Sequence, residues 1–169
     1  MEASGNDLVR RWRATSERQR LLQVVQPGLI GLIDGTISTL APIFAAAYIA
    51  GSRAALLVGL ASALGAAISM GLSEGLSDDG TLTGRGSAVA RGVIIGAMTF
   101  VGGSLHSLPF LINHVQTALA VAYAVVAVEL SVIAWIRKRY LKVRLGQSLI
   151  QVTLGGAVVV AVGVALGHS

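Results

Sequence analysis

The chain has 169 residues, of which 54% are hydrophobic and only 12% are charged. A soluble domain carries about 25% charged residues, so the composition argues against a soluble protein. The net charge of +5 comes from lysines and arginines that flank apolar segments, which indicates membrane topology and not nucleic-acid binding. The sequence contains no cysteine, which excludes a disulfide or a thiolate metal site.

Five apolar segments follow a basic stretch over residues 1–26, which we expect to be cytosolic, as a short interfacial helix or as a tail. Each segment has about the 20 residues that cross a hydrocarbon core of roughly 30 Å. They run over residues 28–50, 54–76, 88–109, 117–136 and 147–167. The pattern predicts an all-α integral membrane protein with five transmembrane helices, in which residues 27–169 form one membrane domain.

The basic residues fall on alternate connections between these segments. Twelve of the thirteen lie before the first segment, between the second and third, or between the fourth and fifth, and Arg53 is the exception. The positive-inside rule therefore predicts an N-in/C-out topology. We expect a multi-pass protein of a bacterial inner (cytoplasmic) membrane. Glycine pairs four residues apart, such as Gly31/Gly35 and Gly92/Gly96, allow close helix packing and permit a dimer.

Asp34 lies inside the first apolar segment. An ionised carboxylate at the centre of a membrane helix costs roughly 2.5–3.5 kcal/mol on insertion scales, so such a residue usually has a function. Ser38 lies one turn further on the same face, and Pro42 leaves the carbonyl of Ser38 without its helical donor. The pattern predicts an oxygen-rich site. The alternative is that Asp34 bonds to nearby hydroxyls and only fixes helix packing.

The second and fourth segments carry further unusual residues. Met70, Glu74 and Asp78 are spaced four apart, which places them on one helix face. Met70, Asp34 and Glu129 each lie about 9–10 Å from the cytoplasmic helix ends at 1.5 Å per residue. The candidate metal ligands are therefore three residues at this level and three at the cytoplasmic entrance: Asp34, Met70, Glu129, Glu74, Asp78 and Asp79.

The types of donor suggest the ion. Carboxylate and carbonyl oxygens with a thioether favour a borderline divalent cation, Fe²⁺ or Mn²⁺. Buried carboxylates also bind protons when no metal is present, because desolvation favours the neutral form. Competition between a proton and a metal ion at one site is the simplest basis for antiport.

Each candidate also has a structural interpretation. Glu74, Asp78 and Asp79 could form a solvated helix end, and Met70 could fill the core. Glu129 could pair with Arg137 or with a neighbouring helix. Two histidines, His106 and His114, lie near the external end of the third segment, where a solvated or capping role is the default and a contact with a proton or metal ion on the exit side is the alternative. A Ser104–His106 hydrolase pair is disfavoured, because side chains two apart on a helix point away from each other.

Two motifs resemble signatures of the vacuolar iron transporter family. The first is GLIDGTIST over residues 31–39, and the second is Ser69-Met70-x-x-x-Glu74. The stretch from Met70 to Gly86 is similar to the membrane domain of a bacterial branch, membrane-bound ferritin or erythrin–vacuolar iron transport fusion proteins. The resemblance covers residues 26–167.

The resemblance implies a five-helix homodimer that exports Fe²⁺, and often Mn²⁺, from the cytosol in exchange for protons. Asp34 and Met70 match the family's intramembrane metal positions, and Glu74 matches its helix-end acid. The chain departs from plant-type members in having only Asp78 and Asp79 in the connection after the second segment. It departs from the fusion branch because residues 1–26 contain no Glu-x-x-His, so ferroxidase activity is not implied.

We therefore expect a transporter and not an enzyme, with no prosthetic group and no nucleic-acid partner. Its expected partners are the metal ion, the lipid bilayer and a second copy of the chain. The alternative is a non-transporting membrane scaffold whose polar residues only hold helices together.

Overall fold

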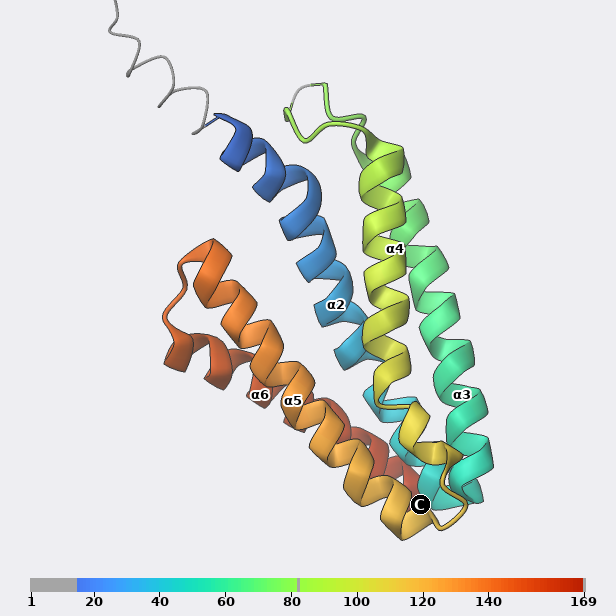
Figure 1. The fold of residues 1–169 in the computed structure, drawn as a ribbon. Helices are drawn as coiled ribbons and strands as arrows, with labels where there is room; N and C mark the ends of the chain where they lie inside the picture. Colours follow the sequence, from blue (N-terminus) through green and yellow to red (C-terminus); the bar gives the residue numbers. More distant parts are fainter. Residues whose placement is uncertain (1–14, 82, 169) are drawn as a thin grey trace, which may run out of the picture.

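The structure is a computed structural model that describes residues 15–81 and 83–168 (Figure 1). Helices dominate these residues, and no strand occurs among them. The elements are η1 (Leu21–Val25), a π-helix, α2 (Gln26–Ser38), α3 (Leu40–Ser77), α4 (Ala88–Leu105), η2 (Leu108–Leu111), a 3₁₀-helix, α5 (Val115–Leu141) and α6 (Leu145–Gly167).

Four helical stretches in the described part of the chain are long and apolar enough to cross a membrane. They are Thr15–Ser77, Ala88–Leu105, Val115–Leu141 and Leu145–Gly167. Their outer faces expose large apolar side chains, among them Leu57, Leu72, Val93 and Val158. The prediction of an all-α protein with membrane-spanning helices is confirmed to this extent.

The first stretch is bent in two places. Thr39 separates α2 from α3, because Pro42 has no N–H and its ring clashes with the carbonyl four residues earlier. Gly51 has φ 80° and ψ −171°, a conformation essentially restricted to glycine. Beyond it the chain folds back, since a Cβ at Gly59 would lie 2.9 Å from Cγ1 of Ile43. In a straight helix these residues would be roughly 24 Å apart.

The helix α3 therefore consists of two antiparallel arms joined at Gly51. Helix α4 packs between α2 and the second arm of α3, while α5 and α6 lie against each other and α6 also contacts α3 (Figure 1). Small residues allow the close approach: a Cβ at Gly92 would lie 2.6 Å from the carbonyl oxygen of Gly71. The glycine pairs thus serve packing within one chain, as the sequence predicted.

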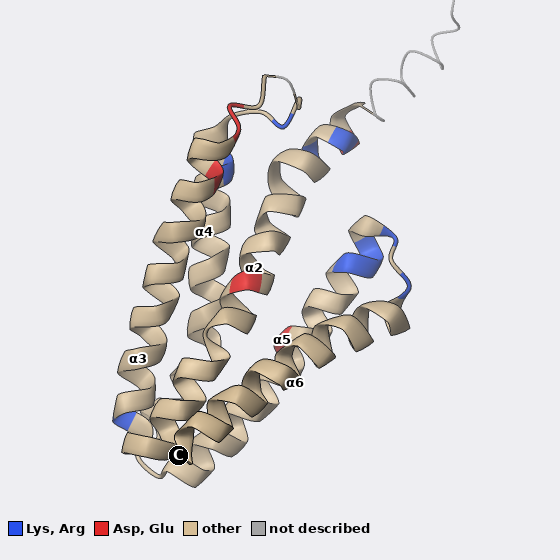
Figure 2. Ribbon diagram, turned by 180° about the vertical axis from the view of Figure 1, so that it is seen from behind, with Lys and Arg blue, Asp and Glu red and all other residues tan. Residues whose placement is uncertain are grey.

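The charged residues are unevenly distributed along the helices. Figure 2 shows lysines and arginines gathered at one end, before α2, in the α3–α4 connection and at the α5–α6 turn. The opposite end has one basic segment, on α3. The acidic segments on α2 and α5 lie between the two ends, within the apolar part of the helices (Figure 2).

Candidate functional site

The six candidate ligands lie in three separate places. Asp34 and Met70 share a hollow, Glu74 and Asp78 belong to a cluster with two arginines next to Asp79, and Glu129 pairs with a histidine. Among the described residues, no group of three or more His, Cys, Asp or Glu side chains could hold a metal ion.

The hollow lies between α2 and the second arm of α3 and has a volume of about 390 Å³. Its α2 wall follows the helical repeat, so one face supplies all its residues. The lining consists of Ile30, Ile33, Asp34, Ile37, Ser38 and Met70. Asp34 is half-buried and makes no hydrogen bond or ion pair within the described part of the chain. The structure therefore does not support the interpretation in which hydroxyls satisfy Asp34.

The donors in this hollow are a carboxylate, a hydroxyl and a thioether, set among isoleucines. A carboxylate without a partner in apolar surroundings is costly, and a cation or a proton would relieve the cost. The thioether of Met70 favours a borderline over a hard divalent ion. The structure brings Asp34 and Met70 together, as the matching depths predicted, and it does not bring Glu129 to the hollow.

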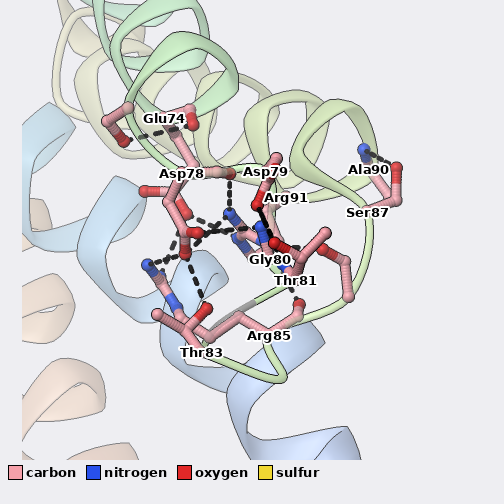
Figure 3. A network of polar contacts seen from close by, with 12 residues as sticks. Glu74, Asp78, Asp79, Gly80, Thr81, Thr83, Arg85, Ser87, Ala90 and Arg91 are labelled. Atoms are coloured by element: carbon pink, nitrogen blue, oxygen red, sulfur yellow. Dashed lines mark hydrogen bonds and ion pairs between the residues drawn. The ribbon is translucent and has the colours of Figure 1, made fainter.

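Two acids near the end of α3 pair with two arginines, and we call this group the arginine cluster. It consists of Glu74, Asp78, Arg85 and Arg91 (Figure 3). Oε1 of Glu74 lies 2.6 Å from Nε of Arg91 and 3.0 Å from Nη2 of Arg85. The same arginines lie 3.4 Å and 3.7 Å from Oδ2 of Asp78. The Arg91 side chain is fully buried, at 0% exposure. Two acids and two arginines balance, so the cluster offers no free carboxylate to an incoming cation.

Hydrogen bonds in the α3–α4 connection hold the two aspartates in place. The N–H of Gly80 and the hydroxyl of Thr83 donate to Asp78 and, with the two arginines, lower the pKa of its carboxyl group. The N–H and hydroxyl of Thr81 donate to Asp79 and lower its pKa in the same way. Both aspartates are therefore ionised turn-forming residues, and Figure 3 shows them folded back onto the loop.

At the third place Glu129 pairs with a residue of a neighbouring helix, as one of the sequence interpretations held, but its partner, His106, was not predicted. Nδ1 of His106 lies 2.9 Å from Oε2 of Glu129, and Nε2 of His106 lies 2.8 Å from the hydroxyl of Thr39. His106 is at 0%, Thr39 at 1% and Glu129 at 6% exposure. His106 is the C-cap residue of α4, as the capping interpretation held, but it is not solvated, because Thr39 and Glu129 contact its ring. Because Oε2 of Glu129 pairs with His106 and Glu129 does not line the hollow, we do not include Glu129 in the metal position at Asp34 and Met70.

Two neighbouring side chains, Arg137 and His114, are engaged elsewhere. Arg137 does not pair with Glu129. Its Nη2 atom donates to Oε1 of Gln151 at 2.9 Å. His114 is exposed and accepts from the N–H of Thr117 at the start of α5, which is the capping role expected of it. A signal for the pairing of His106 with Glu129 was present in the sequence, since an acid and a histidine in neighbouring apolar segments each need a polar partner.

Comparisons of the chain with protein-family models, with curated proteins and with solved structures found no match. Function is therefore inferred from the geometry of the three places. Their distinctive element is the half-buried carboxylate of Asp34, beside the thioether of Met70, in a helix of membrane-spanning composition.

Proposed function

We propose that the protein is a membrane transporter that exports Fe²⁺, and also Mn²⁺, from the cytosol by antiport with protons. The observation that carries this proposal is the unpaired carboxylate of Asp34, which shares an apolar hollow with Met70. Acidic residues inside membrane helices mark ion pathways far more often than they serve packing. The resemblance of residues 31–39 and 69–74 to the vacuolar iron transporters points to the same ions.

The proposed topology has five crossings, N-in/C-out. The stretch Thr15–Ser77 has 63 residues. At 1.5 Å per residue it would extend about 95 Å, roughly three times the hydrocarbon thickness. The reversal at Gly51 lets this stretch cross twice. The gathering of basic residues at one end (Figure 2) supports a cytoplasmic location for that end, in the inner membrane of a bacterium.

In this proposal the metal ion binds between Asp34 and Met70, and water or a second copy of the chain supplies further ligands. A homodimer would suit a site that has one carboxylate and an open side. When the metal leaves, a proton neutralises Asp34, because an empty ionised carboxylate is costly among isoleucines. The arginine cluster keeps Glu74 and Asp78 engaged, so we propose that metal capture begins at the hollow or at Asp79.

The test is metal uptake by the purified protein in proteoliposomes across an imposed pH gradient. We expect wild-type protein to accumulate Fe²⁺ and Mn²⁺ and Asp34→Asn, which keeps the size of the side chain, to lose this uptake. Glu17→Gln is the matched control, because it removes an exposed acid outside the hollow. Uptake by Asp34→Asn at the wild-type rate would refute the site assignment. A wild-type protein that moves no metal would support the scaffold alternative.

A further inference from the structure

The break between α2 and α3 creates an unusual hydrogen-bonding position at Thr39. In an uninterrupted helix the N–H of Thr39 would bond to the carbonyl of Gly35, but here it is directed to the carbonyl of Ile37. The hydroxyl of Thr39 takes over and donates to the Gly35 oxygen at 2.9 Å. A hydroxyl has one hydrogen, so toward its second partner the Thr39 oxygen can act only as an acceptor.

That second partner is His106, and the constraint fixes the protonation of one ring nitrogen. Nε2 of His106 lies 2.8 Å from the Thr39 hydroxyl and must donate, so it carries a hydrogen. The other ring nitrogen, Nδ1, lies 2.9 Å from Oε2 of Glu129. A hydrogen bond at this distance holds a single proton, on the histidine as an ion pair or on the glutamate as a neutral pair. The two arrangements have the same net charge of zero.

Glu129 has a second oxygen that the pair does not use. Oε1 of Glu129 is buried and has no hydrogen-bond partner within the described part of the chain. In the ion-pair arrangement, a hydronium ion can transfer a proton to Oε1 and leave as water, while the imidazolium continues to donate to Oε2. No existing hydrogen bond breaks in this step, and the pair gains one positive charge. A buried polar atom without a partner usually has such a function or an ion to bind.

Few charged groups compete for this proton. The titratable side chains on the elements packed around the pair are Asp34 on α2, Tyr48, Arg53 and Glu74 on α3, Arg91 on α4, and Tyr123, Arg137, Lys138, Arg139 and Tyr140 on α5. Within the described residues, the side chains of His106 and Glu129 form hydrogen bonds only with Thr39 and with each other. Tyr48 and Tyr123 are paired with each other at 3.3 Å.

We propose that His106 and Glu129 form a proton-binding site within the membrane, separate from the metal position at Asp34 and Met70. This inference rests on the proposed antiport and names the residues that bind the coupling proton. The two sites share the last turn of α2: Asp34 precedes Gly35, and the Gly35 carbonyl is bonded to the Thr39 hydroxyl that holds His106. Movement of this turn would therefore affect both sites.

The first measurement is infrared difference spectroscopy of purified, metal-free protein over a pH series from neutral to acid. We expect Asp34→Asn protein, in which Asp34 cannot contribute, to gain a protonated-carboxyl band on acidification, and the same protein with Glu129→Gln added to lack it. The band should persist when Ser131→Ala is added instead, a control on the same helix whose hydroxyl bonds only within α5. If Glu129→Gln does not fold, loss of the band in His106→Gln replaces it. A band that survives in both variants would overturn the proposal.

The second measurement uses proteoliposomes and separates this inference from the proposed function. Mn²⁺ exchange between equal concentrations on the two sides needs no net proton movement, whereas accumulation driven by a pH gradient does. We expect Glu129→Gln to keep the exchange and to lose about tenfold or more of the gradient-driven accumulation. Wild-type accumulation in Glu129→Gln would overturn the inference alone. Absence of both fluxes in wild-type protein would refute the transport function, while the infrared band would still test the pair.

Discussion

The Nε atom of Arg91 lies 2.6 Å from Oε1 of Glu74, and the Arg91 side chain is entirely shielded from solvent. The remaining nitrogens of Arg91 donate to the carbonyl oxygens of Arg85, Gly86 and Asp78. One guanidinium therefore joins the end of α3, the connection and the start of α4. This arrangement gives Glu74 a structural partner at the position where the family resemblance implied a metal-related acid.

Replacement of Arg91 by Met should destabilise the protein by about 3 kcal/mol, because loss of one partner from a buried ion pair leaves an uncompensated charge. Arg85 still reaches Glu74, so we expect the lower end of the known range. The stability of Arg91→Lys should lie between those of the wild-type protein and Arg91→Met, since a lysine keeps the charge but cannot reproduce the planar fork of donors. Unfolding in detergent, followed by the fluorescence of Trp135, measures the difference. Arg144→Met, at an exposed position, is the control, and equal stability of the two Met variants would contradict the prediction.

The α3–α4 connection should be insensitive to pH until strong acid. The folded connection lowers the pKa values of Asp78 and Asp79, so their contribution to stability is complete above the unfolded value of about 3.9 and is lost as the pH falls through the lower folded values. The amide chemical shifts of Gly80 and Thr81 should therefore stay constant down to about pH 4 and change only below it. A transition of these amides near neutral pH would show that the aspartates are not held as the structure describes.

Close packing of α2 on α4 can be tested at Gly35. A Cβ at this position would collide with the backbone carbonyl of Thr99, which cannot move aside as a side chain could. Gly35→Ala should therefore cost about 1–3 kcal/mol or more. Gly65→Ala is the matched control, because a Cβ there meets nothing within 4 Å and alanine is favoured over glycine in a helix by roughly 0.5–1 kcal/mol. The midpoint of thermal unfolding should fall in Gly35→Ala and rise in Gly65→Ala. An unchanged midpoint in Gly35→Ala would show that α2 and α4 are not in contact.

The sequence was sufficient to predict an all-helical chain with apolar segments of membrane-spanning length, because apolar length is a local property. It also predicted that Asp34 and Met70 lie at the same depth, since the rise of a helix converts position into depth, and both line one hollow. The break at Thr39 followed in part from Pro42. What the sequence did not reveal was pairing across helices. Arg91 looked like a topological charge and His106 like a solvated residue, because burial depends on which helix covers which, and no local pattern encodes that.

Depth along the helix was not enough to place Glu129. Its distance from the helix end matched that of Asp34, but depth fixes only one coordinate, and rotation about the helix axis fixes the other. Helix α5 presents Glu129 to His106 at the end of α4, whereas the hollow lies between α2 and the second arm of α3. Residues at one level in a membrane bundle can therefore serve different sites.

The role of Met70 can be separated from its size. Met70→Leu conserves volume and should cost less than about 1.5 kcal/mol in stability, but it removes the thioether. If the sulfur binds the transported ion, uptake of Fe²⁺ and Mn²⁺ relative to Ca²⁺ should fall about tenfold, equal to about 1.4 kcal/mol, because a hydrocarbon offers no preference for borderline ions. Competitive uptake in proteoliposomes measures the ratio. Met98→Leu, a methionine packed against the core, is the control. An unchanged ratio in Met70→Leu would mean that Asp34 selects the ion by charge alone, since the side chain beside it would then contribute only shape.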